Sequence, residues 1–295
     1  YQIKYVLNGG TNDSSNPNSY TIGDLPLTIK NPAREGYIFA GWEYSGTLKE
    51  GTHDPRAVVL DKGTVGNLTF TAKWLKVTSY EGPYDGNAHS ISTEGVGGTI
   101  LYSVDQSNWT AENPSYVDVS SNEDQKYPVY VKLLVEEQNW ESEVISAYVK
   151  ITPRQVTLTS ASDSKAYDGT PLTRPDVTVG GEGFVSGEAT AKATGSALNA
   201  GESVTNTIEI VEGKGYKEGN YTITKLPGTL TVTASEKAIV ITAASNSWMY
   251  NGSAHSDGSY TVTYDGAEIK ANEEGKYILP TGDEVTAVVT GSVTN

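Results

Sequence analysis

The chain has 295 residues, a formal net charge of −15 and no cysteine. The acidic balance argues against nucleic acid as a partner, because neutralising phosphates requires a basic patch that this sequence lacks. The absence of cysteine excludes disulfides and thiolate metal sites. No apolar run reaches the length, about 18 residues, that would predict insertion into a membrane. Abundant β-branched residues and 19 tyrosines favour a mainly β fold.

Residues 1–74 form a first module in which four ordered segments are expected. Residues 2–7 alternate in polarity and predict a strand, while residues 25–29 form a short apolar stretch that predicts one helical turn. Residues 36–42 predict a buried strand flanked by glycines. Residues 68–74 alternate cleanly and predict the strand that closes the module.

Three sequence segments of this module are typical of a known repeat. They are Asn8-Gly9-Gly10, the run Pro32-Ala33-Arg34-Glu35-Gly36-Tyr37-Ile38-Phe39-Ala40-Gly41-Trp42, and Thr71-Ala72-Lys73-Trp74. Together they resemble the internalin-type B repeat, also called the Listeria–Bacteroides repeat. The resemblance implies a small β-grasp fold with at most one short helix on a bacterial surface protein, and it implies that Trp42 and Trp74 are core residues.

A tripeptide that recurs at a constant interval organises the rest of the chain. Its three copies are Tyr84-Asp85-Gly86, Tyr167-Asp168-Gly169 and Tyr250-Asn251-Gly252, and the second lies midway between the first and the third. A constant interval of this length indicates tandem modules, and the boundaries are placed at residues 75–152, 153–235 and 236–295.

Alternating strands are expected to close these modules. Residues 147–152 close the second module and residues 228–233 close the third, each with a period of two. The links between modules span only a few residues, which favours end-to-end packing in an elongated rod. Four modules with strands of about ten residues would reach on the order of 150 Å.

The fourth module is expected to be incomplete. Residues 290–295 match residues 194–199 of the third module, so the last third of the module would lie beyond residue 295. Because the chain also begins inside a strand-like run, the sequence predicts a fragment of a longer polypeptide. A β module without its closing strand exposes an unpaired edge, which predicts an edge-strand contact with another molecule or poor order.

The repeated modules resemble the mostly-beta glycine-rich (MBG) modules of large surface proteins from Gram-positive bacteria. The resemblance rests on residues 84–89, residues 165–172, and residues 219–223 followed by residues 228–232. For the fold, the resemblance leaves two alternatives open, a β-grasp-like module or an immunoglobulin-like sandwich. For the function, it implies a position near an adhesion domain on the bacterial cell surface or cell wall.

The recurring tripeptide is interpreted as a turn marker. Asn251 replaces Asp85 and Asp168, which preserves the shape of the side chain and removes its charge. Asp-Gly and Asn-Gly are strong turn signals. We therefore assign a turn-forming role, and no catalytic or binding role, to Asp85, Gly86, Asp168, Gly169, Asn251 and Gly252.

No catalytic, cofactor or metal site is predicted. His89 and His255 occupy one repeat position, where the third module has Leu172, so that position is expected to pack. His53 stands alone in a polar loop, and three scattered histidines do not form a metal site. No hydrolase, nucleotide-binding or dinucleotide-binding signature is present, so the chain is not expected to be an enzyme.

Two functions remain open on the sequence. The leading hypothesis is a non-catalytic stalk or spacer segment of an extracellular adhesin-like protein. The alternative is an adhesion module that itself contacts a host glycan or protein. Trp109 is the candidate ligand-contacting aromatic for this alternative, because Trp109 has no equivalent in the repeat.

Overall fold

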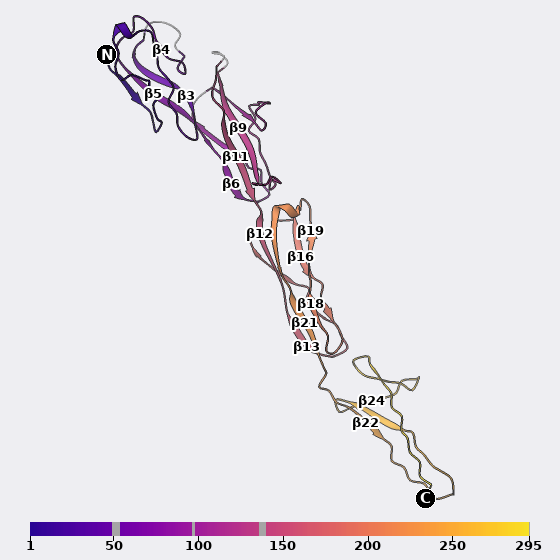
Figure 1. The fold of residues 1–295 in the computed structure, drawn as a ribbon. Coiled ribbons are helices and arrows are strands. Elements are labelled where there is room, and N and C mark those ends of the chain that lie inside the picture. The colour runs from indigo at the N-terminus through magenta and orange to yellow at the C-terminus, as the bar shows by residue number, and fades with distance from the viewer. Residues whose placement is uncertain (49–53, 96–97, 136–139, 295) are drawn as a thin grey trace. The chain divides into compact units, whose positions relative to one another are not determined.

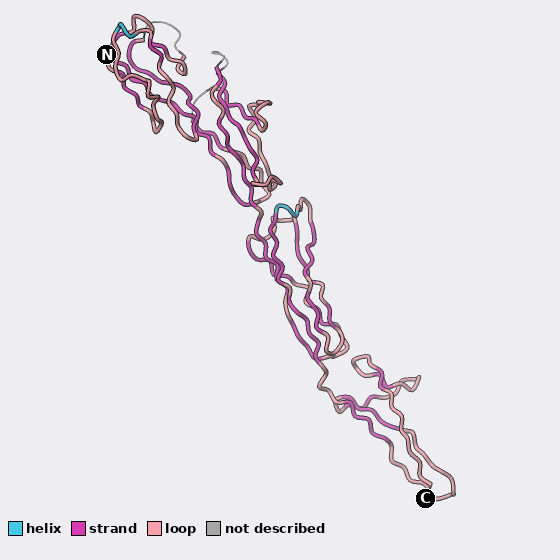
Figure 2. Tube along the Cα trace, in the orientation of Figure 1, coloured by secondary structure: helices cyan, strands magenta, loops and turns pink. Residues whose placement is uncertain are grey.

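The computed structural model describes residues 1–48, 54–95, 98–135 and 140–294. It divides into two compact units, one of residues 1–154 with 217–221 and the other of residues 155–216 with 222–295. The fold is mainly β, as the sequence predicts (Figure 1). Figure 2 shows that strands and loops make up nearly all of each unit, with short helical turns drawn in cyan.

The first unit contains two main sheets. One has the strand order β1-β5-β3, with β7 also paired to β5, and the other has the order β10-β9-β11-β6, with β8 also paired to β9. The elements are β1 (Ile3–Val6), η1 (Ile22–Asp24), β2 (Leu27–Thr28), β3 (Tyr37–Thr47), β4 (Val59–Leu60), β5 (Val65–Thr78), β6 (Tyr80–Pro83), β7 (Ser92–Gly95), β8 (Thr99–Ser103), β9 (Lys126–Val135), β10 (Trp140–Glu141), β11 (Ile145–Thr152) and η3 (Glu218–Asn220).

Strand β5 crosses the sequence boundary between the first two modules without a break. Its early residues pair with β1 in parallel, from Ile3↔Leu68 to Val6↔Thr71. Its last residues pair with β7 of the second module, from Leu75↔Gly95 to Thr78↔Ser92. One continuous strand therefore couples the two modules.

The prediction of a helical turn at residues 25–29 is wrong by a few residues. The 3₁₀ helix η1 lies at Ile22–Asp24, where the Asp24 carboxylate accepts hydrogen bonds from the backbone N–H and the hydroxyl of Thr21. Leu25 and Ile29 are buried, and the Ile29 N–H donates to the Val58 carbonyl at 2.9 Å. Extended backbone buries these apolar side chains on the core, so no helix forms there.

The second unit is built from small sheets. Their orders are β15-β12-β20, β13-β21-β18 and β22-β23-β24, with the pairs β14-β17, β16-β19 and β25-β26. The strands are β12 (Arg154–Ser160), β13 (Asp163–Ala166), β14 (Leu172–Thr173), β15 (Val177–Gly181), β16 (Ala189–Ala193), β17 (Ser196–Ala197), β18 (Ser203–Asn206), β19 (Ile208–Glu212), β20 (Tyr221–Leu226), β21 (Gly228–Thr233), β22 (Ile239–Ala243), β23 (Tyr260–Tyr264), β24 (Ala267–Ile269), β25 (Tyr277–Ile278) and β26 (Glu284–Val285).

Buried apolar side chains gather in each of the first three modules. In the first, Trp42 and Phe70 are buried and meet edge to face, with ring centroids 5.8 Å apart. The inward side chains of β9 and β11 form the second core, and Leu230 and Val232 of β21 pack into the third. The closing strands predicted at residues 147–152 and 228–233 thus contribute directly to these cores.

Candidate functional site

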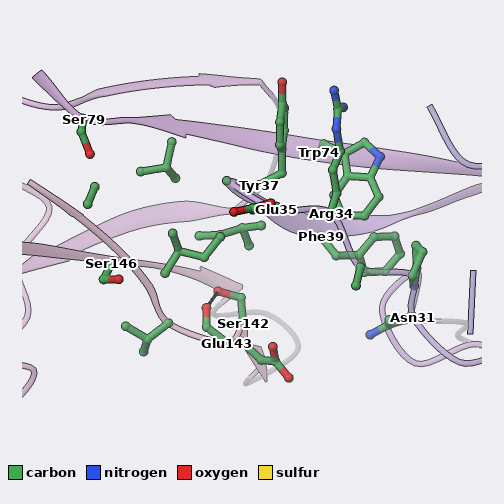
Figure 3. Close-up of a pocket in the computed structure, with 18 of the residues that line it drawn as sticks. Asn31, Arg34, Glu35, Tyr37, Phe39, Trp74, Ser79, Ser142, Glu143 and Ser146 are labelled. Carbon is green, nitrogen blue, oxygen red and sulfur yellow. Dashed lines mark hydrogen bonds between the residues drawn. The ribbon is translucent and has the colours of Figure 1, made fainter. Parts of the chain in front are cut away.

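A cleft of about 720 Å³ in the first unit is a candidate binding site. Residues 31–39 and Trp74 line one part of it, and Trp140 with residues 142–147 line another. The start of β3, the middle of β5 and the segment from β10 to β11 hold these residues in place. Figure 3 shows the side chains that surround the cleft.

The cleft is rich in half-buried aromatic side chains. The Phe39 and Trp74 rings meet edge to face at a centroid distance of 5.6 Å, and Tyr37 meets Trp74 at 6.4 Å. The Trp74 indole N–H donates to the Leu7 carbonyl at 2.9 Å, which fixes the orientation of this ring. Trp140 lines the same cleft. Such rings offer flat apolar contact area whose entropic cost of ordering has already been met by folding.

Polar groups accompany these rings. The Arg34 guanidinium lies 3.6 Å from the centroid of the Tyr37 ring and donates to the Asn8 carbonyl at 2.8 Å. The carboxylates of Glu35 and Glu143 also line the cleft (Figure 3). Aromatic faces beside carboxylate and guanidinium groups can contact a polyhydroxylated ligand, since the rings take its apolar faces and the polar groups take its hydroxyls.

Trp109, the aromatic singled out from the sequence, does not line this cleft. Its indole N–H donates to the Gln106 carbonyl at 3.2 Å, and the Lys132 ammonium lies 4.3 Å from the ring centroid. That ammonium also contacts both carboxylate oxygens of Glu141 at 2.9 Å. A ligand contact at Trp109 stays a prediction, with one neighbouring cation already placed against its ring.

The repeated tripeptide adopts one local geometry in all three copies. Gly86, Gly169 and Gly252 have φ values of 80°, 80° and 79°. The side-chain oxygen of the preceding residue accepts a backbone N–H two positions later, at 2.8 Å for Asp85, 2.9 Å for Asp168 and 2.9 Å for Asn251. Asx turns of this kind use the side chain to mimic a backbone hydrogen bond.

The carboxylates of these turns are held in their charged form. The Asn87 N–H and the His89 ring lower the pKa of Asp85 to about 2. Lys165 and Thr170 lower the pKa of Asp168 through hydrogen bonds. A carboxylate that accepts several hydrogen bonds resists protonation, which suits a structural acceptor better than a general acid.

The histidines lie at different sites. His89 contacts the Asp85 carboxylate at 2.9 Å and stacks on Tyr80, while His255 contacts the Asn251 side chain and stacks on Trp248. His53 lies outside the described residues. Within the described ranges, no group of three or more histidine, aspartate and glutamate side chains is placed to hold a metal ion.

A polar contact at Asn220 was not foreseen from the sequence. The Asn220 side chain is 2 % exposed; its Nδ2 donates to the Asp118 carboxylate at 2.8 Å, and its Oδ1 accepts the Val119 N–H at 2.9 Å. Lys217 forms an ion pair with the same carboxylate. Hydrogen bonds from Asn220 and Lys217 lower the pKa of Asp118. These contacts attach segment 217–221 to the rest of the first unit.

Comparison with known proteins identifies the first module. The family model of the Listeria–Bacteroides repeat domain matches residues 1–73. This match confirms the resemblance drawn from the first module, and it is consistent with an extracellular, repeat-containing surface protein. No helix among the described residues has the length and apolar character to cross a membrane.

The other comparisons add little. No curated protein matches the chain. Among solved structures, the protocadherin gammaB7 EC3-6 cis-dimer shares 9 % sequence identity over 98 % of this chain and 90 % of that chain, with a TM-score of 0.23. A TM-score of that size does not establish a common fold.

Proposed function

We propose that this chain is a non-catalytic spacer segment of a bacterial adhesin-like protein, extracellular and held at the cell surface or cell wall. Residues 75–295 are assigned in this proposal to MBG-like modules. The spacer separates an adhesive domain from the cell and requires no cofactor. The carboxylates of Asp85 and Asp168 each accept a backbone hydrogen bond within a turn, which supports a structural role for these repeated acidic residues.

The observation that carries the proposal is a parallel pairing of an early strand with the last strand in each of the first three modules. β1 pairs with β5, β6 pairs with β11, and β13 pairs with β21, all in parallel. When two neighbouring strands are parallel, the start of one and the end of the other lie at opposite ends of the sheet. Each of these modules therefore receives the chain at one end and releases it at the other, which gives it a net contribution to length.

Small-angle X-ray scattering of the whole chain tests the spacer. A rod on the order of 150 Å long has a radius of gyration of about 40 Å. A compact globule of the same chain length would have a radius of gyration of about 19 Å. A measured radius close to that of the rod supports the proposal, and one close to that of the globule overturns it.

A second candidate function is glycan binding at the aromatic cleft of the first unit. The observation that favours it is the convergence of Tyr37, Phe39, Trp74 and Trp140 with the carboxylates of Glu35 and Glu143 around one cavity. A short host glycan suits this combination, because its ring faces are apolar and its edges carry hydroxyls.

Titration of the chain with sialylated, galactosylated and mannosylated oligosaccharides tests this candidate. Trp140→Ala is expected to weaken binding at least tenfold, because it removes a ring from the cleft. Trp248→Ala, which removes a tryptophan from the second unit, is the matched control and is expected to bind as the unaltered chain does. Equal affinities of Trp140→Ala and the unaltered chain, or no binding at millimolar concentrations, would rule out glycan binding at this cleft.

A further inference from the structure

A second hollow, of about 430 Å³, adjoins the aromatic cleft of the first unit. Arg34, Tyr37 and Trp74 line both spaces, and Figure 3 draws these three side chains next to one another. The other residues that line the hollow are Asn8, Ala72, Lys73, Lys76, Glu94 and Gly95. A ligand that fills the cleft can therefore extend into the hollow.

The sheet register places Lys76 in the middle of a row of side chains. Lys76 of β5 lies opposite Tyr37 of β3 on one side and opposite Glu94 of β7 on the other. Residues directly opposite one another in neighbouring strands project to the same face of a sheet. Trp74, two residues earlier in β5, projects to that face as well. One face of three paired strands therefore brings an ammonium, a carboxylate and two aromatic rings together.

The Arg34 guanidinium is oriented by contacts within the protein. It lies 3.6 Å from the centroid of the Tyr37 ring, and its Nη1 donates to the Asn8 carbonyl at 2.8 Å. It also packs closely on Gly9, where an added Cβ would lie 3.1 Å from Cζ. Among the described residues, Nε and Nη2 have no hydrogen-bond acceptor. A guanidinium held in this way can bind a carboxylate through two parallel N–H···O bonds.

Positive charge predominates around the hollow, although the chain carries a net charge of −15. Arg34, Lys73 and Lys76 line the hollow together with a single carboxylate, that of Glu94. Lys73 forms an ion pair with Glu43 at 2.5 Å, whereas Lys76 is exposed and has no ion-pair partner in the described parts of the chain. The neighbouring cleft has the opposite balance, with two carboxylates and one guanidinium. An anionic group is therefore attracted to the hollow more than to the cleft.

We propose that the hollow binds the carboxylate of an acidic sugar whose uncharged ring faces lie against the aromatic side chains of the cleft. This inference rests on the second candidate function, glycan binding, and names the class of glycan. The Arg34 guanidinium pairs with both carboxylate oxygens, and the Lys76 ammonium adds a second positive charge. A neutral glycan lacks both contacts, so acidic glycans are the preferred ligands.

Isothermal titration calorimetry of the whole chain compares two acidic sugars, sialyllactose and digalacturonate, with their uncharged methyl esters. Esterification removes the charge and leaves the sugar rings unchanged. At least one acid is expected to bind roughly tenfold more tightly than its ester, because only the acid makes the charge-assisted hydrogen bonds. This preference should shrink at high salt, since exposed charges are screened.

Three substitutions locate the preference. Lys76→Gln removes an exposed ammonium and is expected to reduce the preference roughly threefold, as is typical of an exposed ion pair. Arg34→Lys retains the charge but loses the planar fork, and it is expected to remove most of the preference. Lys62→Gln is the matched control, because Lys62 is an exposed lysine that lines neither space, and it should retain the full preference.

The failure of this inference differs from the failure of glycan binding. Equal affinities of acid and ester, with binding still measurable, overturn the acidic subsite and leave glycan binding in place. Absence of binding by all four sugars at millimolar concentrations overturns both. Full preference in both Lys76→Gln and Arg34→Lys, or equal losses in Lys76→Gln and Lys62→Gln, overturns the assignment to the hollow.

Discussion

The attachment of Asn220 to the Asp118–Val119 segment is expected to contribute measurably to the stability of the first unit. Asn220→Ala removes the 2.8 Å hydrogen bond to the Asp118 carboxylate and the 2.9 Å hydrogen bond from the Val119 N–H. A hydrogen bond to a charged group contributes about 1.5–3 kcal/mol, and a buried donor left without an acceptor costs about 1–3 kcal/mol. Because the Val119 amide is only partly buried, we expect a total loss of about 2–4 kcal/mol.

Urea unfolding monitored by tryptophan fluorescence measures this loss, since four of the five tryptophans lie in the first unit. Hydrogen exchange at the Val119 amide supplies a local readout, and its protection should fall. Asn122→Ala is the matched control, because the Asn122 side chain donates one exposed hydrogen bond to the Lys126 carbonyl. Equal effects of the two substitutions would refute the assignment of Asn220 as an anchoring residue.

Three further predictions concern the repeat. Gly169→Ala should destabilise the second unit more than Gly252→Ala, as measured by urea unfolding of the two variants. Both glycines have positive φ, but only at Gly169 would the added Cβ overlap the Thr281 carbonyl oxygen. The pKa of Asp85 is lowered in the folded state, so its contribution to stability should be complete above about pH 4 and fade as the pH falls towards about 2. The difference in free energy of unfolding between the unaltered chain and Asp85→Asn should therefore shrink over that range. Leu230→Ala should cost about 2–5 kcal/mol in chemical denaturation, and a cost below about 1 kcal/mol would show that this buried position does not support the third core.

The sequence predicted best those features that repeat or alternate. The constant interval of the tripeptide predicted a tandem repeat, and the alternation of residues 68–74 predicted the central part of β5. The apolar residues of 25–29 fit a period of two as well as a helical turn, so pattern alone could not choose between them. Contact of Ile29 with the strand-like segment at Val58 decides for extended backbone.

The candidate site depends on contacts between distant residues, for which the sequence carries no local signal. Residues 31–39 and 142–147 meet because β5 leads directly into β6, which belongs to the same sheet as β10 and β11. The partners Asp118 and Asn220 are separated by 102 positions, and each is an ordinary polar residue in its local sequence. Trp109 was chosen as a candidate ligand contact because the repeat has no equivalent residue. The absence of an equivalent does not reveal the neighbours of the ring, which include the Lys132 ammonium.

The parallel pairing within the modules has a consequence under mechanical load. A force that pulls the two ends of a module apart slides β1 against β5, or β6 against β11, along their common axis. In that shear geometry several backbone hydrogen bonds must break together, whereas an antiparallel hairpin pulled at its open end unzips one bond at a time. Because β5 belongs to both of the first two modules, rupture of its pairing with β1 would also transmit tension directly to β7. The first unit is therefore expected to resist stretching as one element, with a high rupture force and few intermediate steps.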